Sequence, residues 1–374
     1  MALPRSKCIK EGQEGVYHCF TRCVRRAFLC GFDTLTQRDF SHRKIWLVDR
    51  LRFLASIFAI DVCAYAVMES HYHTILRTRP DILSTWSDWD VAFRWLTLFP
   101  LKDAAVPPAD EQVRALAHCS QRIAVLRKRL GSLSWFMGRL NEFIARAANK
   151  EDSVKGRFWE SRFKCQNLLD DPAIAACMVY VDLNPIRASL AATPETSNFT
   201  SIQERIRAWH NERMTSHSVP GDSKQNCPSA SFNRVIHTLE DMTDISHAIP
   251  ECVPFNSPHA PSSHWLCPIQ SDSQRRGILQ MTPTDYFDLV DKSGRILRSG
   301  KRGAIDPGLA PILLRISANP ETWIDTVSRF GSKFRLAAGL LSSMRSFADQ
   351  LGRRWLTGVA AARSSFAVLP PQSA

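Results

Sequence analysis

Two strand-like segments joined by a two-residue turn constrain the fold of this chain most strongly. Residues 61–68 (DVCAYAVM) and 71–78 (HYHTILRT) are rich in apolar, β-favouring side chains, and only Glu69 and Ser70 lie between them. Such a short connection joins antiparallel neighbours, whereas parallel strands need a crossover of a dozen residues or more. The sequence therefore predicts a hairpin here, and the other elements have to be arranged around it.

A strand and a helix are predicted before this hairpin. Residues 15–24 alternate in polarity and contain aromatic and β-branched side chains, which indicates a strand. Residues 41–58 carry apolar side chains at helical spacing, with Ser41 as a suitable N-cap. The order strand, helix, strand, strand is typical of an α+β fold. We expect a split-βαβ, ferredoxin-like antiparallel sheet with helices on one face.

Further elements are predicted downstream of the hairpin. We expect an irregular insert over 79–108, two helices over about 110–130 and 134–148, and an extended segment over 156–169. A helix is predicted from Pro172 to about Leu183, because proline is favoured at the first helical position and disfavours helical geometry in the residue before it. Asp171 is its predicted N-cap.

Composition divides the chain into three parts. Residues 207–275 contain much Ser, Pro, His and Asn and are typical of a connector, with one short helix near 231–242. We therefore predict a first domain over 1–206 and a mainly helical accessory domain over 276–374. A continuous helical stretch is expected over 321–355.

The charge balance favours a polyanionic partner. Lys and Arg outnumber Asp and Glu 48 to 36, which gives a formal net charge of +12, and nucleic acid is the usual partner of such an excess. The chain has no run of eighteen apolar residues and no apolar signal-peptide core, so we expect no membrane association and a cytoplasmic location. The eleven cysteines form no CxxC pair and are expected to be reduced thiols.

Two histidines share one face of the second hairpin strand. His71 and His73 are two positions apart, so they point the same way, and Tyr72 points the opposite way. A pair of imidazoles suits a metal ion, a phosphate, or simply a polar sheet surface. Glu69 is in phase with the pair and is a possible additional ligand.

Tyr180 differs from the other four tyrosines because it lies on a well-capped helix, four residues before Asn184. Positions i and i+4 share a helix face, so the phenol and the carboxamide project together. Two structural interpretations remain open. Tyr180 can be a core aromatic, and Asn184 can be a helix stop ahead of Pro185.

Three motifs in this order resemble the single-tyrosine HUH transposases, and most closely their REP-associated branch, with its transposase IS200-like domain. They are HYH at 71–73, RFWESRF at 157–163 and YVDLNPIRA at 180–188. The segment YHCFTRCVRRAFL at 17–29 is also similar to the first strand of that family and the turn after it. The resemblance covers roughly residues 10–206.

The resemblance implies a metal-dependent DNA strand transferase. In that family a tyrosine attacks a phosphodiester of single-stranded or hairpin DNA, leaving a 5′-phosphotyrosine and a free 3′-hydroxyl. Carried over to this chain, Tyr180 is the nucleophile. His71, His73 and Asn184 would hold the divalent metal, Mg²⁺ or Mn²⁺. The resemblance also implies a homodimer.

A DNA-binding surface is predicted from cations that alternate with aromatic side chains, since aromatics stack on unpaired bases while cations follow phosphates. The candidates are Arg22, Arg25, Arg26, Arg157, Trp159, Arg162 and Lys164. The alternative is an amphipathic segment with buried aromatics and solvated cations. A second basic run, Arg295, Arg298, Lys301 and Arg302, fits either a DNA contact or a charged helix surface.

Two other functions stay open. A replication initiator or relaxase-like nickase shares the chemistry, but such proteins commonly carry a helicase, and the chain contains no GxxxxGK[ST] motif. A catalytically silent, domesticated DNA-binding regulator is the other alternative. The intact set of Tyr180, His71, His73 and Asn184 argues against it.

Overall fold

The structure is a computed structural model that describes residues 8–24, 29–34, 37–101, 107–216, 265–298, 313 and 318–366, without the side chains of 211–216 and 298. Residues 207–275 therefore lie largely outside it, as does the short helix expected near 231–242. Within the described ranges all cysteines are free. No helix of these ranges has both the length and the apolar composition needed to cross a membrane.

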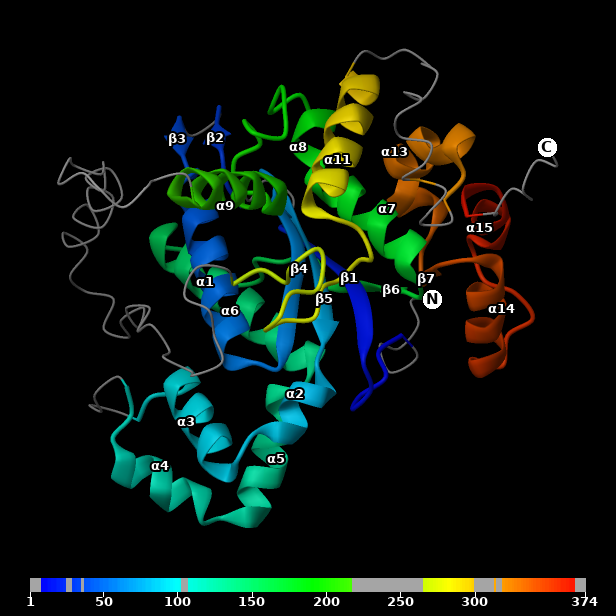
Figure 1. The fold of residues 1–374 in the computed structure, drawn as a ribbon. Helices are drawn as coiled ribbons and strands as arrows, with labels where there is room; N and C mark the ends of the chain where they lie inside the picture. The colour runs from blue at the N-terminus through cyan, green and yellow to red at the C-terminus, as the bar shows by residue number, and fades with distance from the viewer. Residues whose placement is uncertain are drawn as a thin grey trace.

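A five-stranded sheet forms the centre of the described chain (Figure 1). Its strands, in spatial order, are β4 (Ile60–Val67), β5 (His71–Thr78), β1 (Gly15–Arg22), β6 (Lys164–Leu168) and β7 (Ala337–Ala338). Neighbouring strands are antiparallel except β6 and β7, which are parallel. The predicted α+β class is confirmed.

The predicted hairpin is confirmed within one residue at each end. Strands β4 and β5 pair from Ile60 opposite Thr78 to Val67 opposite Tyr72, with a register shift between Val62 and Ala64. Strand β1 pairs with the other edge of β5, so the histidine strand lies between two antiparallel neighbours. This position fixes the direction in which each of its side chains points.

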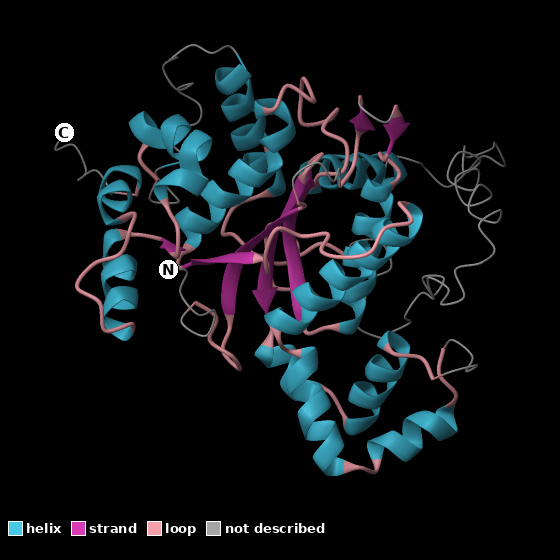
Figure 2. Cartoon of the chain, turned by 180° about the vertical axis from the view of Figure 1, so that it is seen from behind, coloured by secondary structure: helices cyan, strands magenta, loops and turns pink. Residues whose placement is uncertain are grey.

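Helices cover both faces of the sheet, which corrects the expectation of helices on one face (Figures 1 and 2). Helices α1 (Arg43–Ile57) and α6 (Leu133–Glu151) pack on one face, against Tyr17, Tyr65 and Tyr72. Helix α7 (Asp171–Asp182) packs on the opposite face. The apolar side chains of α7 are buried nearly all round, because later helices cover its outer side.

Residues 79–108 contain two helices rather than an irregular insert. Helix α2 (Pro80–Thr85) begins with a proline at its favoured first position. Helix α3 (Asp88–Leu98) begins with a capping box, in which Ser87 and Asp90 each bond the backbone N–H of the other. The helix predicted over 110–130 is divided into α4 (Asp110–Ala117) and α5 (Ser120–Leu130).

The C-terminal region is helical, but it is interrupted where a continuous helix was expected. The segment 321–355 ends its first helix at Lys333, contributes β7 to the sheet and then forms a new helix. The remaining elements are β2 (Phe32–Asp33), β3 (Arg38–Asp39), α8 (Asn184–Arg187), α9 (Ser201–Ser216), α11 (Pro283–Arg298), η2 (Pro320–Thr322), α13 (Trp323–Lys333), α14 (Leu341–Gln350) and α15 (Val359–Ser365).

The C-terminal helices share a hydrophobic core with α7. Tyr286 of α11 is fully buried and donates its hydroxyl to Oδ2 of Asp182 at the end of α7, 2.5 Å away. Val327 and Phe330 of α13 belong to the same core cluster as the inner side of α7. The contact places α13 beside the helix that carries Tyr180. The division of the chain into domains stays a prediction.

Candidate active site

Pairing of β1 with β5 gathers three imidazoles on one sheet face. His73 lies opposite Phe20 and His71 opposite Arg22, while His18 is one alternate position further along β1 on the same face. The ring centroids of His71 and His73 are 5.0 Å apart, and those of His18 and His73 are 5.1 Å apart. The sheet register thus adds His18 to the predicted pair.

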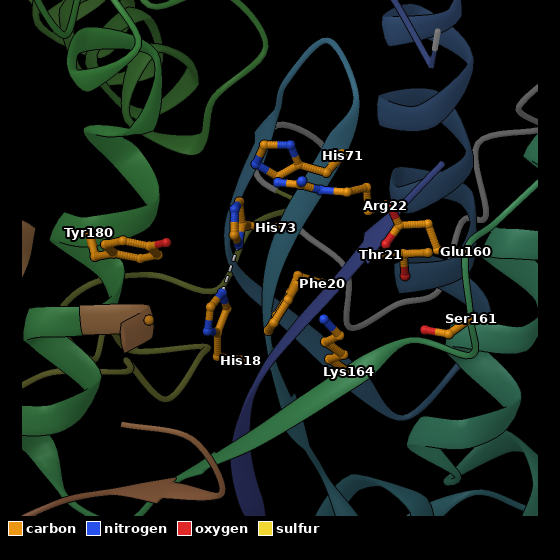
Figure 3. Close-up of a pocket in the computed structure, with 11 residues that line it drawn as sticks. His18, Phe20, Thr21, Arg22, His71, His73, Glu160, Ser161, Lys164 and Tyr180 are labelled. Carbon is orange, nitrogen blue, oxygen red and sulfur yellow. Dashed lines mark hydrogen bonds between the residues drawn. The ribbon is translucent and has the colours of Figure 1, made fainter. Parts of the chain in front are cut away.

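Helix α7 brings Tyr180 to the same face. Asp170, not Asp171, is the N-cap, and its side chain accepts a hydrogen bond from the backbone N–H of Ala173. The Tyr180 ring lies edge-on to two imidazoles, with its centroid 5.7 Å from that of His73 and 6.0 Å from that of His18. In Figure 3 its hydroxyl end points toward these rings.

These side chains line one cavity of about 360 Å³. Tyr180 stands at one side, the three histidines in the middle, and Glu160 and Ser161 at the other side (Figure 3). Gly331 lies next to the Tyr180 hydroxyl. The complete lining is His18, Phe20, Thr21, Arg22, His71, His73, Glu160, Ser161, Lys164, Tyr180 and Gly331. The cavity has the size of a ligand site and combines a phenol, imidazoles and cations.

A chain of hydrogen bonds orients the central imidazole. Nε2 of His18 is 2.9 Å from Nδ1 of His73, and Nδ1 of His18 is 3.4 Å from Oε1 of Gln166. Because an amide oxygen only accepts, Nδ1 of His18 carries the proton and Nε2 of His18 accepts from Nδ1–H of His73. The lone pair of His73 is then on Nε2. Ser70 contacts Nδ1 of His71 in a similar way, at 3.1 Å.

Burial keeps all three imidazoles neutral at pH 7. It lowers the pKa of His18 to about 4. Burial, with a smaller contribution from the charge of Arg22, lowers the pKa of His71 to about 4. Burial and the neighbouring His18 and His71 also lower the pKa of His73 well below its ordinary value. Neutral imidazoles are the form that binds metal ions.

The phenol of Tyr180 is half-buried against Arg187, Phe330 and Gly331, to which the sequence analysis gave no role in the site. Burial raises the pKa of Tyr180, while the guanidinium of Arg187, 4.9 Å from the ring centroid, opposes this rise. Phe330 packs on the ring, and a Cβ at Gly331 would lie 3.1 Å from the hydroxyl oxygen. Ionisation of Tyr180 therefore needs further positive charge, such as a bound cation would bring.

Asn184 is placed differently from the sequence expectation. Its amide Nδ2 donates to the carbonyl oxygens of Tyr180, at 3.0 Å, and Val181, at 3.4 Å. It is not among the described residues that line the cavity. Asn184 is the first residue of the short helix α8, and its side chain bonds the last turn of α7, which ends at Asp182.

The predicted DNA-contacting residues fall into four groups. Arg22 and Lys164 line the cavity, while Arg157 and Arg162 are exposed and line a second one. Trp159 is buried, and its indole N–H donates to the carbonyl oxygen of Asn141 at 2.8 Å, which favours a packing role over stacking on bases. Arg25 and Arg26 lie outside the described residues, as do Lys301 and Arg302.

The side chains of His71 and His73 suit a cation that binds imidazole nitrogen. His71 and His73 use their Nδ1 atoms in hydrogen bonds, which is the pattern in which Nε2 is the ligating atom. The described residues contain no cluster of three His, Cys, Asp or Glu side chains placed to hold one ion. Glu69 is exposed and lies against Gly31. The protein thus offers two imidazoles, and other ligands would have to come from substrate and water.

Comparison with known proteins gives little to add to this geometry. No family model matches the chain, and no curated protein matches it. Among solved structures it is similar to a REP-associated tyrosine transposase bound to a REP hairpin, with 12% sequence identity and a TM-score of 0.32, over 60% of this chain and 95% of that chain. A likeness at this level is distant.

Proposed function

We propose that this protein cuts and rejoins single-stranded or hairpin DNA through a covalent bond to Tyr180, as a transposase does. The observation that carries the proposal is the meeting of Tyr180 with the histidine pair in one cavity, from elements more than a hundred residues apart. The motif resemblance described above supplies the reaction class. Arg22 and Lys164, which line the same cavity, suit a phosphodiester substrate.

In the proposed reaction the Tyr180 oxygen attacks phosphorus, and the bond between phosphorus and the O3′ atom of the preceding nucleotide breaks. The phenolic proton passes to solvent, and the departing 3′ oxygen takes one up. The products are a 5′-phosphotyrosine and a free 3′-hydroxyl, so one phosphodiester is exchanged for another. Because the bond energy is retained, a second 3′-hydroxyl can reverse the step and rejoin a strand without ATP.

His71 and His73 would hold a divalent cation through their Nε2 atoms. When bound, the cation supplies positive charge to the phosphate oxygens and favours the ionised phenol. Imidazole nitrogens bind Mn²⁺, Zn²⁺ or Ni²⁺ more readily than Mg²⁺. Of the two metals expected from sequence, the proposal therefore favours Mn²⁺.

The test is incubation of the full chain with end-labelled single-stranded hairpin DNA and Mn²⁺. We expect the wild type to form an adduct that survives denaturation and maps to Tyr180. Tyr180→Phe should form no adduct but should bind the same DNA. Tyr286→Phe is the matched control, since it removes a phenol from the same core without approaching the cavity.

The silent regulator is the second candidate, because two observations favour it: burial raises the pKa of Tyr180, and the Asn184 side chain bonds backbone carbonyls of α7. Binding without an adduct under Mg²⁺, Mn²⁺, Zn²⁺ and Ni²⁺ would establish the regulator and exclude the transferase.

A further inference from the structure

A second cavity, of about 520 Å³, lies between α6 and the segment 157–163. We call it the Gly138 groove. Ser134, Gly138 and Asn141 form its helical side, at the spacing of successive turns on one helix face. Segment 157–163 forms the other side with Arg157, Phe158, Trp159, Ser161, Arg162 and Phe163. Its volume is within the ~300–1,000 Å³ range of ligand pockets.

Gly138 is the unexpected residue of this groove. It is an interior residue of the nineteen-residue helix α6, where glycine costs stability relative to alanine. A Cβ at Gly138 would meet no atom within 4 Å, so close packing does not require glycine there. Its lack of a side chain leaves this part of the groove open.

The groove is charged for a polyanion. Two of the described residues that line it are cationic, Arg157 and Arg162, and none is acidic. Both arginines are exposed, while Phe158, Trp159 and Phe163 are buried beneath them as an apolar floor. Cations above an apolar floor fit a nucleotide, with its phosphate at the rim and its base inside.

The groove also adjoins the candidate active site. Ser161 lines both cavities, and the backbone around it is fixed to β1, since Glu160 N–H donates to the carbonyl oxygen of Arg22 at 3.0 Å and Val24 N–H to that of Phe158 at 2.9 Å. Segment 157–163 is therefore a fixed ridge, with the histidine cavity on one side and the groove on the other.

We propose that the Gly138 groove binds an unpaired nucleotide of the DNA strand whose phosphodiester lies in the histidine cavity. This rests on the proposed function, because the cleavable phosphate defines the strand that crosses the ridge at Ser161. The base lies over the Gly138 backbone and against the part of the floor that Phe158 and Phe163 form, while Arg157 and Arg162 contact the adjoining phosphates.

The test uses a short single-stranded oligothymidylate that carries one photoreactive 4-thiothymidine, with Tyr180→Phe protein so that nothing is cleaved. We expect cross-links to residues 134–141 and 157–163. Gly138→Trp fills the groove and should lower affinity by about tenfold, the loss of one stacked base, and abolish those cross-links. Gly138→Ala adds only a methyl group and should retain most binding, which checks that the helix tolerates a side chain.

The charge arm compares Arg162→Ala with Arg146→Ala, an exposed arginine on α6 that does not line the groove. Arg162→Ala should reduce the slope of log K against log [salt] by about 0.7, the share of one single-strand phosphate contact. Arg146→Ala should leave the slope unchanged. Equal slopes for the two variants would contradict the assignment.

Failure of this inference is distinguishable from failure of the proposed function. If wild-type protein forms the Tyr180 adduct while Gly138→Trp binds oligothymidylate normally and cross-links fall elsewhere, the groove assignment is wrong and the reaction stands. If no adduct forms but the groove cross-links appear and depend on Gly138, the groove is a DNA site in a protein without the reaction. If neither appears, both are wrong.

Discussion

His18 and His73 are joined ring to ring across two strands, with Nε2 of the first 2.9 Å from Nδ1 of the second. His18 is also hydrogen-bonded to Gln166 on β6. Residues of β1, β5 and β6 together therefore determine which nitrogen of His73 is unprotonated. The Nε2 lone pair of His73 is on the ring edge left available for a ligand. In the proposed reaction His18 would therefore be a positioning residue, acting on a cation or phosphate through His73.

Replacing His18 tests this role. In His18→Ala, Nδ1 of His73 loses its hydrogen-bond partner, and the His73 ring is no longer held in its orientation. We therefore expect Mn²⁺ affinity to fall by roughly 10- to 100-fold. His18→Gln, which keeps an acceptor, should recover part of it. Titration calorimetry with Mn²⁺ alone measures the effect, with thermal unfolding run in parallel. Unchanged Mn²⁺ affinity in folded His18→Ala would show that His18 only fills space.

The buried imidazoles predict a dependence of stability on pH. The pKa of His18 falls from 6.5 to about 4 on folding, so between these values the unfolded chain binds more protons than the native one. Stability contributed by the neutral ring is present above pH 6.5 and is lost as the pH falls toward 4. For a fully buried ring the loss is up to about 3 kcal/mol. His18→Gln should lessen the decline in urea-unfolding free energy between pH 7 and pH 5, and an identical decline would contradict the assignment.

The carboxyl group of Asp182 changes stability with pH in the opposite direction to His18. Burial raises its pKa to about 6 although Ser201, Ile202 and Tyr286 donate to it. Above its unfolded value of 3.8 the native state holds the proton more tightly, so this carboxyl costs stability as the pH rises from 4 through 6. Asp182→Asn keeps most of the hydrogen bonds and should gain stability relative to wild type at pH 7 more than at pH 5. Urea unfolding at both values measures this; a gain that does not grow with pH would refute it.

Sequence was sufficient for the elements with strong local signals. The hairpin around Glu69 and Ser70 follows from two apolar runs and a turn too short for any other connection. Helix α7 follows from Pro172 at its start and ends at Asp182, one residue before the predicted Leu183, although Asn184 and Pro185 then begin helix α8. In both cases the residues that decide the structure are within a few positions of it.

Elements that depend on distant partners were missed. Residues 321–355 have helical spacing, yet the chain leaves the helix after Lys333, because Ala337 and Ala338 complete the sheet edge beside β6. Gly339 permits the approach: a Cβ there would lie 2.7 Å from a carboxylate oxygen of Asp170. The sequence around Gly339 contains no pattern that predicts its contact with Asp170.

The site shows the same limit. Sequence periodicity placed His71 and His73 on one face and singled out Tyr180, but His18 joined them only through the β1–β5 register, which composition does not fix. Its signal was present in the alternation of residues 15–24, where His18 is in phase with Phe20 and Arg22. Of the two interpretations left open for Trp159, the structure shows burial, with the indole N–H donating to the backbone carbonyl of Asn141 on α6.

Gly331 gives the C-terminal region a direct part in the proposed reaction. It lines the histidine cavity from α13, and a Cβ there would lie 3.1 Å from the Tyr180 hydroxyl oxygen, closer than an unstrained contact. Gly331→Val should move the hydroxyl and slow formation of the DNA adduct by at least tenfold, since misplacing a nucleophile by about 1 Å costs up to roughly 100-fold. DNA affinity should not change, because the substitution adds no charge and leaves the cations in place. Ser332→Ala, on the exposed side of the same helix, is the control and should react like wild type. Single-turnover adduct formation measures the rate and binding anisotropy the affinity; a Gly331→Val protein with the wild-type rate would show that the nucleophile is positioned without α13.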